Sequence, residues 1–240
     1  MIAPNIFFKF EYKSNILFVS TRFWNINNEY NLMTKYLDLN VSTFDIFASS
    51  NFIELYKYTD FIFKVIKHLI IKYKFKKIIF CGICKDCHLE CLLVKKLYDD
   101  NFCDLEYHIV GTPLMMDLTK KIDMEQYSQM ILSGMNDPQI KKYLEVRNII
   151  DIAKDIPNLK LYSIIANRNN IDIKIEKDNI DPETGLPIND LKIYNISLST
   201  EVNDKASHNF YYHSFKYNRN HNIIQPRLKY LIKKIINDNV

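Results

Sequence analysis

Short apolar stretches recur along the chain and are separated by polar segments. The run Ile16-Leu-Phe-Val-Ser is almost continuously apolar, as is Lys77-Ile-Ile-Phe-Cys. Such runs are typical of strands that are covered on both faces of a sheet. Together with the other strand-like stretches, they predict strands at 5–10, 15–20, 43–48, 77–81, 106–110, 159–166 and 192–198.

Other stretches have the spacing of helices. In the segment 52–73, Leu55, Ile62, Ile66, Leu69 and Ile70 fall on one stripe, with lysines opposite. Further helices are predicted at 28–37, at 85–97, in pieces over 117–155 with a break at Asn136-Asp-Pro, and at 225–237. The polar segment 169–189 predicts a loop or hairpin insertion.

Strands alternate with helices from residue 16 onward. This order predicts a three-layer α/β/α fold with a mostly parallel sheet and helices on both faces. The chain has 240 residues and shows neither an internal repeat nor a low-complexity linker. A single domain over 1–240 is therefore expected.

Composition and charge indicate which kinds of binding partner and which cellular compartment to expect. The net charge is only +4, and the densest basic run, 227–234, fits the solvated face of an amphipathic helix better than a surface for nucleic acid or a membrane. The N-terminus lacks the pattern of a signal peptide, and no stretch is apolar for long enough to span a bilayer. The chain has five cysteines, an odd number, and four of them lie close together in the sequence, which is not the pattern of a secreted protein held together by disulfides. A reduced, cytoplasmic protein without bound cofactor is expected.

The candidate chemistry lies where the strand at 77–81 meets the following helix. The strand runs into Gly82, and Cys84 stands in the turn before the helix. Ligands of open α/β sheets bind at the carboxyl ends of strands, and the dipole at a helix N-terminus favours an anion. A thiolate at Cys84 would gain reactivity from that position.

The segment resembles the nucleophile elbow of α/β-hydrolase-like proteins from bacterial surface-polysaccharide (capsule) biosynthesis and accessory secretion systems. Their elbow commonly reads Gly-Thr-Ser-Lys-Gly-Gly and leads into a helix that ends in Lys-Lys-Leu. Gly82 matches the first glycine, Cys84 the serine and Lys85 the lysine, and the helix end at 92–97, Leu-Leu-Val-Lys-Lys-Leu, matches as well. The resemblance implies an α/β-hydrolase-like fold and a nucleophile at Cys84.

Two positions depart from that pattern. Asp86 and Cys87 stand where the family has two glycines. A sharp elbow favours small residues, and the Asp86 carboxylate would disfavour a neighbouring thiolate. These departures favour an alternative in which the site is degenerate and the protein binds a glycan or a partner protein without catalysis.

The cysteines allow another interpretation. Cys81, Cys84, Cys87 and Cys91 have the spacing C-x2-C-x2-C-x3-C of bacterial ferredoxin ligands. However, Leu92 rather than proline follows the last cysteine, and a strand and a helix flank the motif. Small residues buried around a turn are therefore the favoured interpretation, while a metal or iron–sulfur site remains an alternative.

A cysteine nucleophile needs a base and a group that orients it. In the α/β-hydrolase order the acid follows a late strand and the histidine comes after it. His208 and His221 lie in the right region and both remain candidates, with a slight preference for His208, while His68, His88 and His108 are disfavoured. His213 lies in the same late region. The acid position falls on Asp172 or on Asn170.

The oxyanion hole would use backbone N–H groups of Lys85 and of the segment near Thr21 and Arg22. The resemblance implies hydrolysis of an acyl ester, or acyl transfer, on an acylated sugar or polysaccharide, with a protein partner in a glycan or secretion assembly as a further expectation. Neither a metal nor a nucleic acid is expected at this site.

Overall fold

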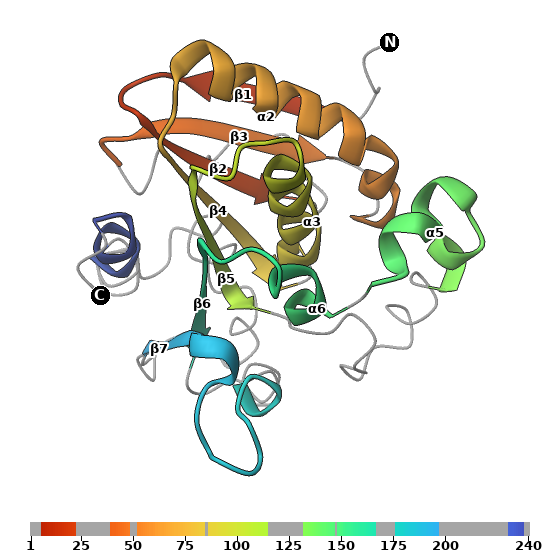
Figure 1. Ribbon diagram of the computed structural model, residues 1–240, viewed down its shortest axis with the longest axis vertical. Coiled ribbons are helices and arrows are strands. Elements are labelled where there is room, and N and C mark those ends of the chain that lie inside the picture. Colours follow the sequence, from red (N-terminus) through yellow and green to blue (C-terminus); the bar gives the residue numbers. More distant parts are fainter. Residues whose placement is uncertain are drawn as a thin grey trace, which may run out of the picture.

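A seven-stranded sheet forms the centre of the computed structural model (Figure 1). The structure describes residues 6–22, 39–48, 52–84, 86–114, 132–146, 148–166, 176–196 and 230–237. The strands are β1 (Ile6–Glu11), β2 (Ile16–Arg22), β3 (Ser42–Ala48), β4 (Lys77–Cys84), β5 (Glu106–Leu114), β6 (Leu159–Ala166) and β7 (Lys192–Ile196). Their order in the sheet is β1-β3-β2-β4-β5-β6-β7.

All neighbouring strands are parallel except β1, which pairs antiparallel with β3. The predicted mostly parallel sheet is therefore confirmed. β1 and β2 follow one another in the chain but lie on either side of β3. The strand predicted at 106–110 is longer than expected, because it continues through Gly111-Thr-Pro to Leu114.

Helices cover both faces of the sheet. The named helical elements are η1 (Phe52–Tyr58), α2 (Thr59–Tyr73), α3 (Asp86–Asp99), α5 (Pro138–Leu144), α6 (Ile149–Ala153) and η2 (Ile188–Asp190). A further helix spans 230–236, within the predicted 225–237. The helix predicted at 28–37 lies outside the described residues.

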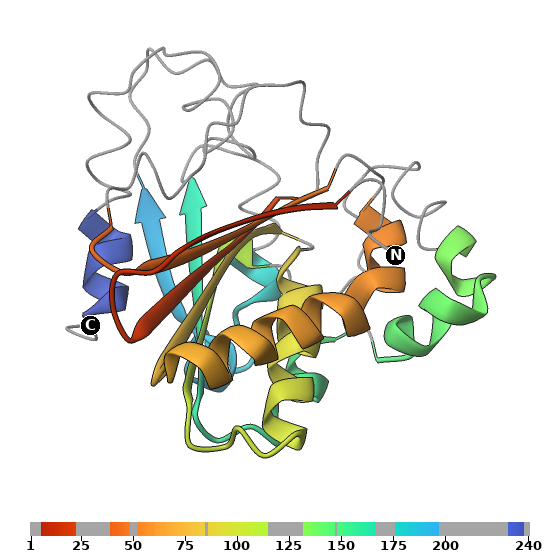
Figure 2. The same ribbon diagram turned by 90° about the horizontal axis from the view of Figure 1, so that it is seen from above.

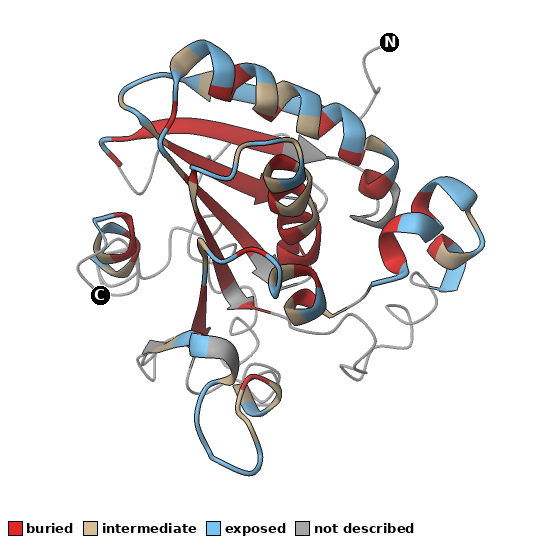
Figure 3. Ribbon diagram, in the orientation of Figure 1, coloured by how far each residue is buried: buried red, intermediate tan, exposed pale blue. Residues whose placement is uncertain are grey.

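Alternating side chains of each strand supply the two layers of core. Ile78 and Phe80 of β4 pack with α2, α3 and α6, whereas Ile79 and Cys81 pack on the other face with the helix at 230–236. Figure 2 shows α2 and α3 on one side of the sheet and the C-terminal helix on the other. Figure 3 shows that burial is concentrated in the sheet and in the inner face of α3. The three layers therefore arise from the period of two along the strands.

Local capping explains the predicted break at Asn136-Asp-Pro. Asp137 has an extended backbone, and its side chain accepts a hydrogen bond from the Gln139 N–H at 2.9 Å. Pro138 then takes the first position of α5, where its missing N–H costs nothing. Asn148 caps α6 in the same way, through the Ile150 N–H at 2.8 Å. The helical region is therefore divided by two polar N-caps.

His108 is a buried part of the sheet rather than a candidate base. Its Nδ1 lies 3.1 Å from the Tyr162 hydroxyl, and its Nε2 lies 3.0 Å from Glu106 Oε1. Burial lowers the pKa of His108 from 6.5 to about 4, although the Glu106 carboxylate opposes that shift. Lys77 and Lys160 also pair with Glu106 at 3.2 and 2.9 Å. The imidazole is therefore neutral at physiological pH.

This neutral histidine predicts a loss of stability in mild acid. In the unfolded chain His108 binds a proton once the pH falls below its ordinary pKa of 6.5. In the folded protein it binds a proton only near pH 4. The free energy of unfolding should fall by on the order of 2–3 kcal/mol as the pH drops from 6.5 to 4. Denaturant unfolding of the wild type and of His108→Gln checks this, since the variant should lose less stability between pH 7 and pH 5. Parallel declines in the two proteins would contradict it.

Candidate active site

The connection between β4 and α3 is a very short turn at the carboxyl edge of the sheet. β4 ends at Cys84 and α3 begins at Asp86, so that only Lys85 separates the strand from the helix. β4 pairs with β2 on one side and with β5 on the other. The predicted strand–turn–helix unit is thus present in the middle of the sheet. Because β4 is parallel to its neighbours, Cys84 lies at the edge where ligands of such sheets bind.

A β-bulge in the neighbouring strand accompanies the turn. Gly82 pairs with Gly111 and Cys84 with Leu114, so that β5 contributes one more residue than β4 between these pairs. Two side chains hold the Leu114 backbone in this position. Its N–H donates to Ser163 Oγ at 3.1 Å, and its carbonyl accepts a hydrogen bond from Asn179 Nδ2 at 3.2 Å. The strand end that faces Cys84 is therefore anchored from β6 and from the segment before β7.

Gly82 leaves no room for a side chain. A Cβ at this position would lie 2.6 Å from Glu90 Oε1, 2.7 Å from Thr21 Oγ1 and 2.9 Å from Asp86 Cβ. Real Cβ atoms do not approach other atoms so closely. Gly82 is the position at which the sequence matches the first glycine of the elbow pattern. The close approach of β2 and α3 to the β4 backbone gives the physical reason for a glycine there.

The first turns of α3 carry buried polar groups. The side chains of Asp86, His88 and Glu90 are at most 1% exposed. Burial raises the pKa of Glu90 well above its ordinary value, and the negative charge of Asp86 adds to this rise. Hydrogen bonds from the Thr21 hydroxyl and the Cys87 thiol oppose it. Asp86 stands in the first turn, where the helix dipole favours its negative charge.

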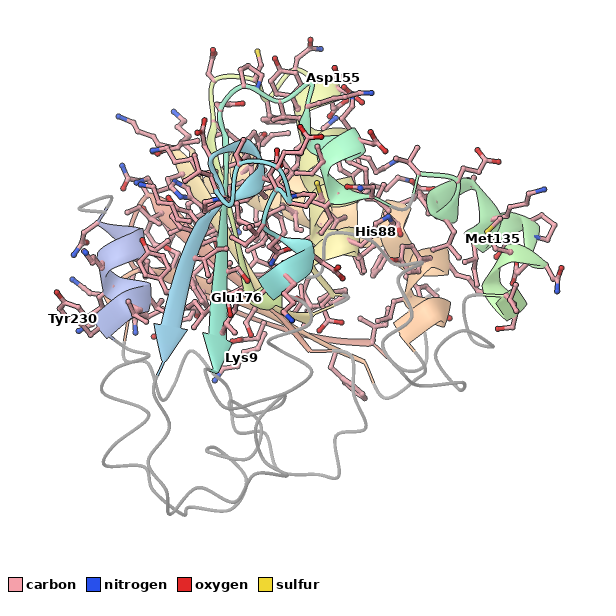
Figure 4. All side chains as sticks on the ribbon, turned by 90° about the horizontal axis from the view of Figure 1, so that it is seen from below. Lys9, His88, Met135, Asp155, Glu176 and Tyr230 are labelled. Atoms are coloured by element: carbon pink, nitrogen blue, oxygen red, sulfur yellow. The ribbon has the colours of Figure 1, made fainter. Side chains whose placement is uncertain are left out.

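His88 is held inside the protein by two hydrogen bonds. Its Nε2 lies 2.7 Å from the Val146 carbonyl oxygen, which can only accept, so that Nε2 carries the proton. Nδ1 then accepts from the Tyr56 hydroxyl, also at 2.7 Å. Burial raises the pKa of Tyr56 well above 10.0, and Asp86 adds to that rise, so the hydroxyl stays protonated. Figure 4 labels His88 in the interior, on the side of the molecule that carries α5 and α6. Both ring nitrogens are thus used in structural contacts.

The described cysteines do not lie together. Cys87 and Cys91 are buried on the α2–α3 side of the sheet, whereas Cys81 is buried on the opposite face. The Cys91 thiol lies 3.8 Å from the Ile149 carbonyl oxygen, and burial raises the pKa of this thiol. Among the described residues, no group of three or more His, Cys, Asp or Glu side chains could hold a metal ion. Cys81 thus lies on the other face of the sheet from Cys87 and Cys91, which favours small buried residues over a shared cluster as the interpretation of the C-x2-C-x2-C-x3-C spacing.

The structure describes only some of the predicted site residues. Thr21 lies near the carboxyl end of β2, where its buried side chain donates a hydrogen bond to Glu90 Oε1. Lys85, Asn170, Asp172, His208, His213 and His221 lie outside the described residues. β6 ends at Ala166 and β7 at Ile196, directly before the segments that contain Asp172 and His208. β6 and β7 thus end at the same edge of the sheet as β4, as the arrows of β6 and β7 show in Figure 2.

Comparison with solved structures agrees with this topology. MenH from S. aureus matches with a TM-score of 0.50 and 11% identity, covering 98% of this chain and 99% of that protein. Esterase B from Lactobacillus rhamnosis, solved with a C4-C4 tributyrin phosphonate, matches with a TM-score of 0.50 and 10% identity, over 90% and 87% of the two chains. The chain has the α/β-hydrolase fold. No protein-family model and no curated protein matches the sequence.

The first turns of the helix that follows β4 are buried more completely than their polar residues alone would indicate. The segment Asp-Cys-His-Leu-Glu-Cys has three polar residues in six, but all six residues are buried. The bond from Thr21 to Glu90 and the Tyr56–His88 pair were not predicted. One signal was available, because no lysine or arginine occurs between Asp86 and Val94. In the part of the chain that the structure describes, no helix is long and apolar enough to cross a membrane.

Proposed function

We propose that the protein is an esterase-type or acyltransferase-type enzyme that uses Cys84 as its nucleophile. The observation that carries the proposal is the single-residue connection between β4 and α3 at the carboxyl edge of a parallel sheet, with a cysteine as the last residue of the strand. A nucleophile in such a turn is presented toward solvent and next to the N–H groups of a helix start. The proposal combines this geometry with the α/β-hydrolase fold.

The reaction would proceed through a thioester. The Cys84 sulfur, after a base has taken its proton, attacks the carbonyl carbon of an ester and forms an S–C bond. The ester C–O bond breaks, and the alcohol leaves with the proton that the base returns. Water, or the hydroxyl of an acceptor in a transferase, then attacks the thioester. The C–S bond breaks, the acid or new ester leaves, and the thiol is regenerated.

The other groups of the site follow the order of elements along the chain. We propose His208 or His221 as the base, with Asp172 or Asn170 as the group that orients it. Support comes from the sheet, since the segments after β6 and β7 begin at the edge where β4 ends. The oxyanion hole would use the Lys85 N–H and an N–H from the segment that begins near Thr21.

For the substrate we propose an acyl ester carried by a sugar or polysaccharide of a bacterial surface-glycan pathway, with action in the cytoplasm. The support is the resemblance of Gly82, Cys84, Lys85 and the helix end at 92–97 to the elbow of proteins from such pathways. A protein partner in a glycan or secretion assembly belongs to the same proposal.

A non-catalytic relative is the second candidate. Its support is that Asp86 and Cys87, which replace two glycines of the elbow pattern, are 1% and 0% exposed, and that Asp86 Cβ would lie 2.9 Å from a Cβ at Gly82. A carboxylate next to the turn works against ionisation of a thiol there. Under this alternative the protein would bind a glycan or a partner protein at the same edge of the sheet and catalyse no reaction.

Alkylation by iodoacetamide separates the two candidates. If Cys84 is an activated nucleophile, iodoacetamide should modify it about tenfold or more faster than Cys103, which is exposed and serves as the internal reference. The variants His208→Ala and His221→Ala should differ in this rate ratio. Only the variant that lacks the true base should lose the faster modification of Cys84. Peptide mapping by mass spectrometry at short times provides the rates. Equal, slow modification of all the cysteines would overturn the enzyme proposal and favour the binding protein.

A further inference from the structure

The bond between Thr21 and Glu90 joins two elements that are not consecutive in the chain. Thr21 lies in β2, and Glu90 lies in the second turn of α3, beyond the turn at Cys84. The Thr21 hydroxyl donates to Glu90 Oε1 inside the protein, where both side chains are at most 1% exposed. β2 and β4 are neighbours in the sheet. The bond therefore ties the carboxyl end of β2 to the helix that follows β4.

The same two side chains pack directly on the β4 backbone. The space beside the Gly82 Cα is occupied by Glu90 Oε1 and Thr21 Oγ1, at 2.6 and 2.7 Å from where a Cβ would stand. Gly82 precedes Cys84 by two residues. A displacement of Glu90 would thus be transmitted to the strand end that carries the candidate nucleophile, as well as to the end of β2.

We propose that Glu90 is a positioning residue of the candidate active site, which holds the carboxyl end of β2 and the β4–α3 turn at a fixed spacing through Thr21 and Gly82. These two segments are the ones expected to supply the backbone donors of the oxyanion hole. Glu90 itself is fully buried and does not touch a substrate. This inference rests on the proposed function, because the spacing matters only if Cys84 reacts.

The environment of Glu90 indicates how its carboxyl group performs this role. Asp86 and Cys87 of the same helix face it, with Thr21 from β2 and Gly82 from β4, while Tyr56 of η1 adjoins Asp86. Among the residues that the structure describes, no cationic side chain is a cause of the shift in its pKa, and burial raises that pKa. Burial thus favours the protonated, uncharged form of this carboxyl group.

A glutamine reproduces this arrangement. Its amide oxygen can replace Oε1 as the acceptor for Thr21, and its NH₂ group takes the place of Oε2 without a charge. Glu90→Gln should therefore behave like the wild type, whereas Glu90→Ala should not. Thr21 offers a second matched pair, since Thr21→Ser keeps the hydroxyl and Thr21→Val removes it at almost unchanged volume.

The test measures the ratio of iodoacetamide alkylation rates at Cys84 and Cys103 in these four variants. We expect Glu90→Gln and Thr21→Ser to keep the wild-type ratio within about twofold, and Glu90→Ala and Thr21→Val to reduce it about tenfold. If Glu90→Ala does not fold, the comparison of Thr21→Ser with Thr21→Val tests the positioning role by itself. A wild-type preference for Cys84 that all four variants retain would overturn the positioning role and leave the proposed function intact. Absence of any preference in the wild type would overturn both.

The pH dependence of stability tests the raised pKa of Glu90. A folded-state pKa above the unfolded value makes the contribution of Glu90 to stability complete in acid, and that contribution is lost progressively as the pH rises toward the folded pKa. The thermal midpoint of the wild type should therefore fall relative to that of Glu90→Gln between pH 5 and pH 8. An unchanged difference between the two midpoints at every pH would contradict the raised pKa of Glu90.

Discussion

Replacing Cys84 by alanine is expected to reduce ester hydrolysis by on the order of a thousandfold or more. The reason is that Cys84 is the last residue of β4 and the only side chain proposed to form a covalent bond with the acyl group. Removal of a nucleophile leaves only the modest contribution of binding and of the backbone donors. Release of p-nitrophenol from p-nitrophenyl butyrate measures the rate, with the fold of the variant checked by circular dichroism.

Cys103→Ala is the matched control for that variant. Cys103 lies in the exposed loop between α3 and β5, at the opposite edge of the sheet from Cys84. Its replacement should leave the hydrolysis rate within about twofold of the wild type, as for a typical surface substitution. If Cys84→Ala hydrolyses the ester as fast as Cys103→Ala does, the nucleophile has been assigned to the wrong residue.

Gly111→Ala is expected to destabilise the protein by about 3 kcal/mol or more. A Cβ at Gly111 would lie 2.3 Å from Leu114 Cα and 2.6 Å from Leu114 N. These are backbone atoms, so no side-chain rotation can relieve the collision. The hydrogen bonds of the Leu114 backbone to Ser163 and Asn179 would have to break for the bulge to open. For a chain of this size the melting temperature should fall by roughly 6–12 °C.

The exposed turn at Gly185 provides the control for Gly111. A Cβ at Gly185 would meet nothing within 4 Å, although its φ of +67° disfavours alanine. Gly185→Ala should therefore cost only about 1 kcal/mol. Differential scanning calorimetry of both variants makes the comparison. Equal effects of the two substitutions would show that the bulge at Gly111 relaxes easily, and that it does not hold the strand end next to Cys84.

The sequence predicted the layers of the fold because its strands carry a clear signal. Buried parallel strands appear as short apolar runs, and the run at 159–166 matches β6 from end to end. The turn at Cys84 was predicted for a similar reason, because a single glycine interrupts an apolar strand that leads into a helix. Periodicity thus locates the elements and the edge of the sheet where a site would lie.

The sequence pattern did not predict the structure at positions where contacts between distant parts of the chain determine it. Gly111-Thr-Pro was interpreted as the end of a strand, but β5 continues through it as a bulge that Ser163 and Asn179 stabilise. Similarly, glutamate is a residue type of solvated helix faces, but Glu90 is buried and its pKa is raised, because β2 and β4 enclose it. Such contacts join residues far apart in the chain, and no local spacing encodes them. The proposed base, His208 or His221, and the proposed orienting group, Asp172 or Asn170, stay predictions from chain order.

The central claim is that the β4–α3 turn presents Cys84 as a nucleophile, and trapping the acyl-enzyme tests it most directly. The wild-type protein is mixed with p-nitrophenyl butyrate, quenched in acid within the first turnover and mapped by mass spectrometry. The account predicts a butyryl thioester on the peptide that contains Cys84, with Cys103→Ala acylated equally and Cys84→Ala not at all. Release of p-nitrophenol with the butyryl group on another residue, or on none, would contradict it.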